Sequence, residues 1–168
     1  MADGLDPWAR GAVRVKWPND LLLNGRKLGG ILCEASWDGH KLDHVVVGIG
    51  LNLVQGPDDF PDPIRDAAIS LRIFANAPLS RYDVASSVVA RLRDLAFTPW
   101  AAAESVVEDF AARDALYGRP IEVRDPEALQ LLQSGVADGI DAGGALLLRR
   151  DDGANGAVRT GTVRLRER

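Results

Sequence analysis

The sequence predicts an α+β protein in two parts, residues 1–115 and residues 116–168. Short strand-like segments fill residues 13–54, and a helical period follows them as far as residue 115. After that point the chain returns to short apolar segments separated by turn dipeptides. The second part is too short for more than a small core, so we expect it to pack on the first part.

Apolar segments bounded by turn residues predict the strands of the first part, at residues 13–17, 21–23, 27–36 and 42–53. The dipeptides Asn24-Gly25 and Asp38-Gly39 predict tight hairpins between these strands. Pro18 has no N–H to give to a ladder, so we expect the first strand to end there. Asn19 and Asp20 would then lie in the turn.

Two helices are predicted in the rest of the first part. Val84, Val88 and Leu92 recur at every fourth position, with Val89 and Leu95 beside them, and Pro99 would end this helix. A second helix is expected over residues 101–115, with its buried side formed by Val106, Val107 and Phe110.

The second part reads as a small all-β module. Its apolar segments cover residues 118–123, 134–141, 144–150 and 156–165, and Asp-Pro, Asp-Gly and Gly-Gly turns separate them. A helix across residues 137–148 would contradict this prediction.

The composition is that of a folded globular protein, with 46% hydrophobic and 26% charged residues. The net charge of −4 gives no basic footprint for nucleic acid, and no apolar run is long enough to cross a membrane. The single cysteine, Cys33, excludes an internal disulfide, which fits a cytoplasmic location. Because Cys33 alternates with Ile31 and Ala35, we expect a packed thiol.

Residues 45–53 place two kinds of side chain on the two faces of one strand. Strand alternation predicts an ordinary core face with four apolar side chains, those of Val47, Ile49, Leu51 and Leu53. The opposite face carries Gly48, Gly50 and Asn52. A helix packed over the glycines would explain one glycine, but two glycines followed by an amide favour the floor of a ligand site.

Lys27 precedes a second glycine pair, Gly29-Gly30, at the start of its strand. A lysine at the mouth of a glycine-lined strand suits an anion such as a carboxylate or a phosphate. A solvated turn lysine remains an equal alternative on this feature alone. His40 and His44 have no metal-ligand spacing around them and are expected at the surface.

Three motifs together resemble those of the biotin protein ligases: KWPND at residues 16–20, KLGGILCE at residues 27–34 and GIGLN at residues 48–52. The resemblance covers nearly the whole chain. It implies a catalytic domain similar to class II aminoacyl-tRNA synthetases, truncated at its N-terminus, followed by a small SH3-like β-barrel.

The resemblance also implies an activity. The family condenses biotin with ATP to biotinyl-5′-AMP and passes the biotinyl group to a lysine of a biotin carboxyl carrier protein. By resemblance, Lys27 would hold the biotin carboxylate and the α-phosphate, and Asp20 would accept the proton of the incoming lysine. Asn19, Asp20 and Asn52 would serve the adenylate and Mg²⁺. Gly30, Leu32 and Gly48 would form the wall of the biotin pocket, and Gly50 would also bind biotin or the adenylate.

The sequence departs from the family at its N-terminal side. The loop of Gly-Arg-Gly-Arg type that closes over biotin and the adenylate in the family has no counterpart here. A truncated product, one half of a split enzyme and a sequence begun at an internal methionine all stay open. We therefore expect this chain alone to form biotinyl-AMP poorly. The alternative is a non-catalytic half-site that binds nucleotide or acceptor protein, as a homodimer or with a complementing N-terminal half.

Overall fold

The structure, a computed structural model, describes residues 1–76, 78–97 and 103–166. It combines helices and antiparallel sheets, as the sequence predicts, and contains two compact units. The N-terminal unit comprises residues 1–14 and 19–96, and the C-terminal unit comprises residues 15–18 and 97–168. The domain boundary at residue 116 stays a prediction.

A four-stranded sheet in the order β1-β2-β3-β4 organises the N-terminal unit. The strands are β1 (Val13–Lys16), β2 (Asp20–Leu23), β3 (Arg26–Asp38) and β4 (Lys41–Leu51). Asn24 and Gly25 have φ angles of 51° and 74°, the left-handed backbone that a tight hairpin turn requires. The second hairpin turns at Gly39 and His40, one residue later than expected.

The helices of the N-terminal unit are mostly short. The 3₁₀ helices are η1 (Ala2–Leu5), η2 (Pro57–Asp59) and η3 (Asp62–Ile64), and the α-helices are α1 (Asp6–Ala9), α2 (Leu71–Ala75) and α3 (Arg81–Phe97). The sequence analysis missed all of these except α3, because one turn carries too little periodicity. Val84 and Val88 of α3 are buried as predicted, whereas Val89 and Leu95 are exposed.

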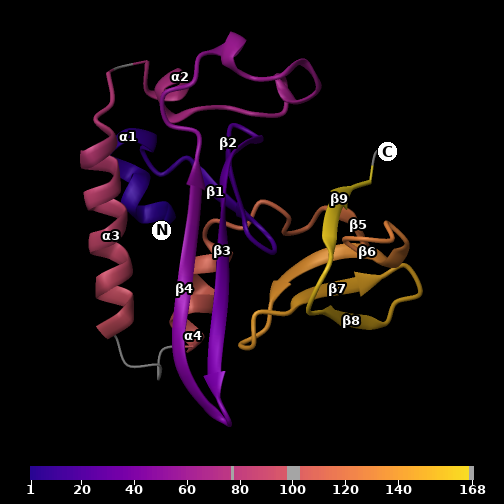
Figure 1. The fold of residues 1–168 in the computed structure, drawn as a ribbon. Coiled ribbons are helices and arrows are strands. Elements are labelled where there is room, and N and C mark those ends of the chain that lie inside the picture. The colour runs from indigo at the N-terminus through magenta and orange to yellow at the C-terminus, as the bar shows by residue number, and fades with distance from the viewer. Residues whose placement is uncertain (77, 98–102, 167–168) are drawn as a thin grey trace. The chain divides into compact units, whose positions relative to one another are not determined.

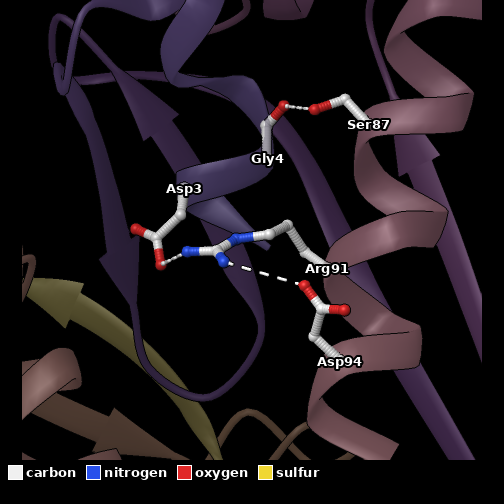
Figure 2. A network of polar contacts seen from close by, with 5 residues as sticks. All are labelled: Asp3, Gly4, Ser87, Arg91 and Asp94. Atoms are coloured by element: carbon white, nitrogen blue, oxygen red, sulfur yellow. Dashed lines mark hydrogen bonds and ion pairs between the residues drawn. The ribbon is translucent and has the colours of Figure 1, made fainter.

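Polar contacts join the N-terminus of the chain to α3, as Figure 2 shows. Ser87 Oγ donates to the carbonyl oxygen of Gly4 at 2.7 Å. Arg91 lies between Asp3, at 3.5 Å, and Asp94, at 3.9 Å. A Cβ on Gly4 would be only 3.3 Å from Val88 Cα, so glycine lets η1 approach the helix closely.

The β3–β4 hairpin extends beyond the short strands β1 and β2 (Figure 1). It corrects two expectations. Cys33 is exposed, so its thiol is not packed. Val47 is 40% exposed, and Ile49, Leu51 and Leu53 are only half-buried, so the expected core face is wrong. The reason is register, because β2 pairs only with residues 26–30 of β3, and in the described residues nothing in this unit covers the outer hairpin.

The C-terminal unit contains α4 (Ala103–Ala111) and a five-stranded sheet in the order β8-β7-β6-β5-β9. The strands are β5 (Pro120–Arg124), β6 (Leu131–Ile140), β7 (Leu146–Arg150), β8 (Asn155–Val158) and β9 (Thr162–Leu165). The four predicted segments contain these strands in part: β6 begins three residues earlier than expected, and the segment at residues 156–165 is divided between β8 and β9. No helix crosses residues 137–148. The strand order is open, so the sheet forms no closed barrel over the described residues.

Part of the helix prediction for this unit differs from the structure. Val106 of α4 is 56% exposed, whereas Phe110 packs against the core of the unit. Pro99 and Ala101, the expected end and start of the two long helices, lie outside the described residues. Within the part of the chain that the structure describes, every helix is too short or too polar to cross a bilayer.

Trp17 belongs to the core of the C-terminal unit. It is 5% exposed and clusters with Leu116, Ile121 and other apolar side chains of the five-stranded sheet. Its indole N–H donates to the carbonyl oxygen of Gly144 at 2.9 Å. The chain enters the N-terminal unit again at Asn19, two residues later. The tryptophan of the KWPND motif therefore packs in the core of the C-terminal unit.

Asp114 gives the C-terminal unit a predicted pH dependence. Its Oδ1 accepts from the Leu116 N–H at 2.7 Å, while its Oδ2 is buried without a partner among the described residues. Burial raises the pKa of Asp114 above its ordinary value of 3.8, against the lowering effect of the Leu116 and Tyr117 backbone N–H groups. The folded protein therefore holds this proton more tightly than the unfolded chain does.

The free energy of unfolding should consequently fall as pH rises through the interval just above 3.8. We expect Asp114→Asn to remove this fall, so that the variant gains stability relative to the parent as the pH rises through that interval. Urea unfolding at several pH values measures the difference. A difference between the two proteins that stays constant with pH would contradict the prediction.

Candidate functional site

A row of directly paired residues crosses the N-terminal sheet. Asp20 of β2 pairs with Gly30 of β3, and Gly30 pairs with Gly50 of β4. Leu32 and Gly48 form a second pair two residues further along the hairpin. Directly paired residues of neighbouring strands project to the same face of a sheet. Five predicted site residues therefore share one face, which we call the glycine face.

A β-bulge brings Lys27 to the same face. From Leu21 to Leu22 the register advances one residue on β2, while on β3 it advances two, from Gly29 to Lys27. In a regular strand Lys27 and Gly30 would project to opposite faces, because their spacing is odd. The extra residue, Leu28, reverses the alternation and places Lys27 beside Leu22, on the face of Asp20.

Lys27 and Asp20 form an ion pair on this face. The Lys27 Nζ lies 2.5 Å from Asp20 Oδ1, and their side chains are 56% and 22% exposed. Because the lysine end of the pair is exposed to solvent, the pair contributes only about 0–1 kcal/mol to stability, so an anionic ligand can displace the carboxylate at little cost. The site thus holds an accessible cation with a carboxylate within reach.

The glycines of the face have different surroundings. A Cβ on Gly50 would meet nothing within 4 Å, and one on Gly48 would make only ordinary contacts with Leu32. A Cβ on Gly30 would lie 3.2 Å from the Asn19 carbonyl oxygen. Within the described residues of the N-terminal unit, no helix packs over Gly50 or Gly48, so the helix-packing explanation of these glycines is not met there. The face is open at the position where a ligand is expected.

Gly29 differs from Gly30, Gly48 and Gly50 because its surroundings are tightly packed. It is buried, and a Cβ there would collide with the Gly50 carbonyl oxygen and lie 2.9 Å from the Leu51 side chain. Glycine at this position allows β3 and β4 to approach closely. Its role is in packing, whereas Gly50 leaves open space.

The remaining predicted residues lie around this face. Leu32 is 60% exposed, and Asn19 is exposed in the turn with its carbonyl oxygen bonded to the Ile31 N–H at 2.9 Å. Asn52 is half-buried, and its Nδ2 donates to the carbonyl oxygens of Lys27 at 3.3 Å and Ile69 at 3.2 Å. Sequence reasoning missed the segment at residues 67–69, which no motif marks.

His40 and His44 are exposed, as expected. The described residues contain no group of three or more His, Cys, Asp or Glu side chains that could hold a metal ion by themselves. A cavity of about 290 Å³ lies in the C-terminal unit between Gly118, Arg119, Pro120, Leu165 and Arg166. None of the predicted site residues lines it.

The chain is a mixed α/β protein whose glycine-lined sheet face presents the Lys27 ammonium beside Asp20. Residues 9–52 match the Biotin/lipoate A/B protein ligase family. The matched residues include the whole glycine face and Lys27.

Curated relatives extend the likeness along the chain. The bifunctional ligase/repressor BirA of Bacillus subtilis is 32% identical over 157 residues, which cover 91% of this chain and 46% of that protein. The biotin--[acetyl-CoA-carboxylase] ligase of Paracoccus denitrificans is 37% identical over 143 residues, which cover 80% of this chain and 56% of that protein. The chain spans about half the length of the curated relatives it matches.

Solved structures share the fold. The biotin protein ligase of Aquifex aeolicus in complex with biotin and ATP superposes with a TM-score of 0.75 at 20% identity, covering 99% of this chain and 67% of that one. At this identity the likeness supports the fold alone.

Proposed function

We propose that this chain acts as a biotin–[biotin carboxyl-carrier protein] ligase, which activates biotin with ATP to biotinyl-5′-AMP and transfers it to an acceptor lysine. The observation that carries the proposal is the Lys27–Asp20 pair on an open glycine face, inside the segment that matches the ligase family. The named activities of the relatives from Bacillus subtilis and Paracoccus denitrificans support it.

Both steps of this reaction concentrate negative charge in one place. The first brings a carboxylate against the α-phosphate. In the second, the acceptor amine attacks the biotinyl carbonyl carbon, an oxyanion develops on the carbonyl oxygen, and AMP leaves. Fixed cations and N–H donors stabilise such charge. In this proposal Lys27 exchanges Asp20 for the biotin carboxylate and the α-phosphate. The released Asp20 carboxylate then accepts the proton of the acceptor lysine, and the open space at Gly50 and Gly48 admits the ligand.

Mg²⁺ fits this site only when it is bound together with the nucleotide. Mg²⁺ in proteins is commonly held by one or two carboxylates together with substrate phosphates. Asp20 supplies one carboxylate, and Asn19 and Asn52 carry amide oxygens of the type that Mg²⁺ accepts. The ion would neutralise phosphate charge there.

The finer features of the fold belong to the same proposal. The N-terminal unit would correspond to a class II aminoacyl-tRNA synthetase-like catalytic domain, and the five turn-bounded strands of the C-terminal unit to an SH3-like module. A biotin carboxyl carrier protein would be the partner. A homodimer or a complementing N-terminal half remains part of the proposal, and the free thiol of Cys33 supports a cytoplasmic location.

Biotin-dependent ATP–pyrophosphate exchange tests the function. The chain would be assayed alone and fused behind the part of the Paracoccus denitrificans ligase that it does not match, since it covers 56% of that protein. We expect exchange from the fusion, followed by biotin transfer to a carrier domain, and little exchange from the chain alone. No exchange from the fusion would count against the ligase proposal. Strong exchange from the chain alone would contradict the need for a complement.

A further inference from the structure

We infer that Asn52 is a positioning residue for Lys27, which holds the backbone at the bulge through both of its amide N–H groups. Toward a ligand, Asn52 then offers only its carbonyl oxygen. This inference rests on the proposed function for the role of Lys27, but its structural content can be tested without biotin or ATP.

The two contacts of Asn52 fix the orientation of its amide. Its Nδ2 lies 3.3 Å from the Lys27 carbonyl oxygen and 3.2 Å from the Ile69 carbonyl oxygen. Both partners are acceptors, so only the NH₂ group can face them. An asparagine amide has two N–H groups, and two acceptors occupy both of them. No N–H of Asn52 is left to bind a phosphate oxygen.

The carbonyl groups that Asn52 joins belong to the segments that enclose Lys27. The Lys27 N–H donates to Ala67 O at 2.7 Å, and the Ile69 N–H donates to Lys27 O at 3.0 Å. The backbone of Asn52 takes part as well, since its N–H donates to Leu28 O at 2.8 Å and its carbonyl accepts from the Leu71 N–H at 2.9 Å. Asn52 therefore ties the end of β4 to both segments.

The bulge explains why the hydrogen bonds of Asn52 are needed at this place. An inserted residue interrupts the ladder hydrogen bonds and lets the strand bend. Leu28 is that residue, and it lies directly after Lys27. A shift of the Lys27 backbone would carry its ammonium away from the glycine face. Asn52 opposes this shift, because the second acceptor for the same amide, Ile69 O, is in a buried residue.

The consequence for ligand recognition is specific. Only the lone pairs of Asn52 Oδ1 remain for a ligand, so the group placed there must be a cation or a ligand N–H or O–H. A phosphate oxygen can be bound on this face by the Lys27 ammonium, but not by Asn52.

Isosteric substitution separates the two roles of the amide. Asn52→Asp keeps the size and an outward oxygen but removes both N–H donors, whereas Asn52→Ala removes the donors and the oxygen. If Asn52 positions Lys27, both variants should speed hydrogen exchange at the Ile69 and Lys27 amides about tenfold, the effect of losing one or two modest hydrogen bonds. An aspartate variant with parental exchange rates beside a perturbed alanine variant would overturn the inference.

Lysine signals give a second measurement on the same variants. The chain has three lysines, Lys16, Lys27 and Lys41. After reductive ¹³C-methylation, NMR should show the Lys27 signal moved in both variants, with the Lys41 signal unchanged as an internal control. An unmoved Lys27 signal would contradict positioning.

The parent protein provides a test that does not depend on a variant folding. We expect slow exchange of both Asn52 Nδ2 protons and a nuclear Overhauser contact between them and Ile69. On addition of a biotinyl-adenylate analogue to the fusion, both proton signals should stay in place. Fast exchange of these protons would overturn the inference, and so would an Nδ2 proton signal that moves on ligand addition because the proton now donates to the ligand. If substitutions of Lys27 leave the affinity for the biotinyl-adenylate analogue unchanged, that result would refute the proposed function but not this inference.

Discussion

Replacing Lys27 by methionine is expected to lower biotin-dependent ATP–pyrophosphate exchange about 10²–10³-fold, the usual cost of removing one group that stabilises developing negative charge. Methionine keeps much of the unbranched stem but removes the ammonium that lies 2.5 Å from Asp20 Oδ1. The exchange rate of the fused protein and its affinity for a biotinyl-adenylate analogue measure the effect.

Lys41→Met is the matched control, because Lys41 is an exposed lysine at the tip of the β3–β4 hairpin, away from the glycine face. It should retain the parental exchange rate. The thermal midpoint of Lys27→Met should remain close to that of the parent, since the exposed ion pair is worth at most about 1 kcal/mol. Equal exchange rates for the two methionine variants would remove Lys27 from the proposed chemistry.

Gly29→Ala should destabilise the N-terminal unit by about 3 kcal/mol, whereas Gly50→Ala should leave its stability within about 0.5 kcal/mol of the parent. The two glycines are neighbours across β3 and β4, but their surroundings differ. A Cβ on Gly29 collides with the backbone of Gly50, and the rigid ladder cannot move aside. A Cβ on Gly50 enters open space. Urea unfolding measures both changes.

The same pair of variants tests the ligand site. If the ligand lies against the open space at Gly50, the added methyl group should weaken binding of the adenylate analogue at least about tenfold in Gly50→Ala, although the protein stays folded. Parental affinity in Gly50→Ala would place the ligand elsewhere. Parental stability in Gly29→Ala would show that β3 and β4 can separate more easily than their packing implies.

Local signals in the sequence were sufficient for most of the strands. The Asn24-Gly25 turn adopts the backbone that its residue types favour. The four turn-bounded segments after residue 117 contain β5 to β9, with the last segment divided between β8 and β9. Such features depend on nearest neighbours, so a sequence contains the information for them. One-turn helices such as α1 and α2 escaped notice because they contain less than one period of the helical pattern.

Burial on the β3–β4 hairpin was not predictable from the chain. Alternation separated Val47 from Gly48 correctly, but it did not tell which face is covered. The outer hairpin has neither a neighbouring strand at residues 31–38 nor a covering layer among the described residues of its unit. Cys33 is exposed for this reason, although Ile31 and Ala35, two positions away on either side, are apolar. Burial is a property of what packs on a strand.

The residue types of the candidate site were determined by the sequence: a lysine before a glycine pair, an aspartate after a proline turn, and a glycine strand that ends in asparagine. Their geometry was decided only by the tertiary structure. The bulge at Leu28 turned Lys27 onto the face of Asp20, and the approach of β4 made Gly29 a packing residue. The Asn52 amide nitrogen donates to two carbonyl groups far from it in the chain, those of Lys27 and Ile69. Register and hydrogen-bond partners join residues far apart in the chain, and no local pattern specifies them.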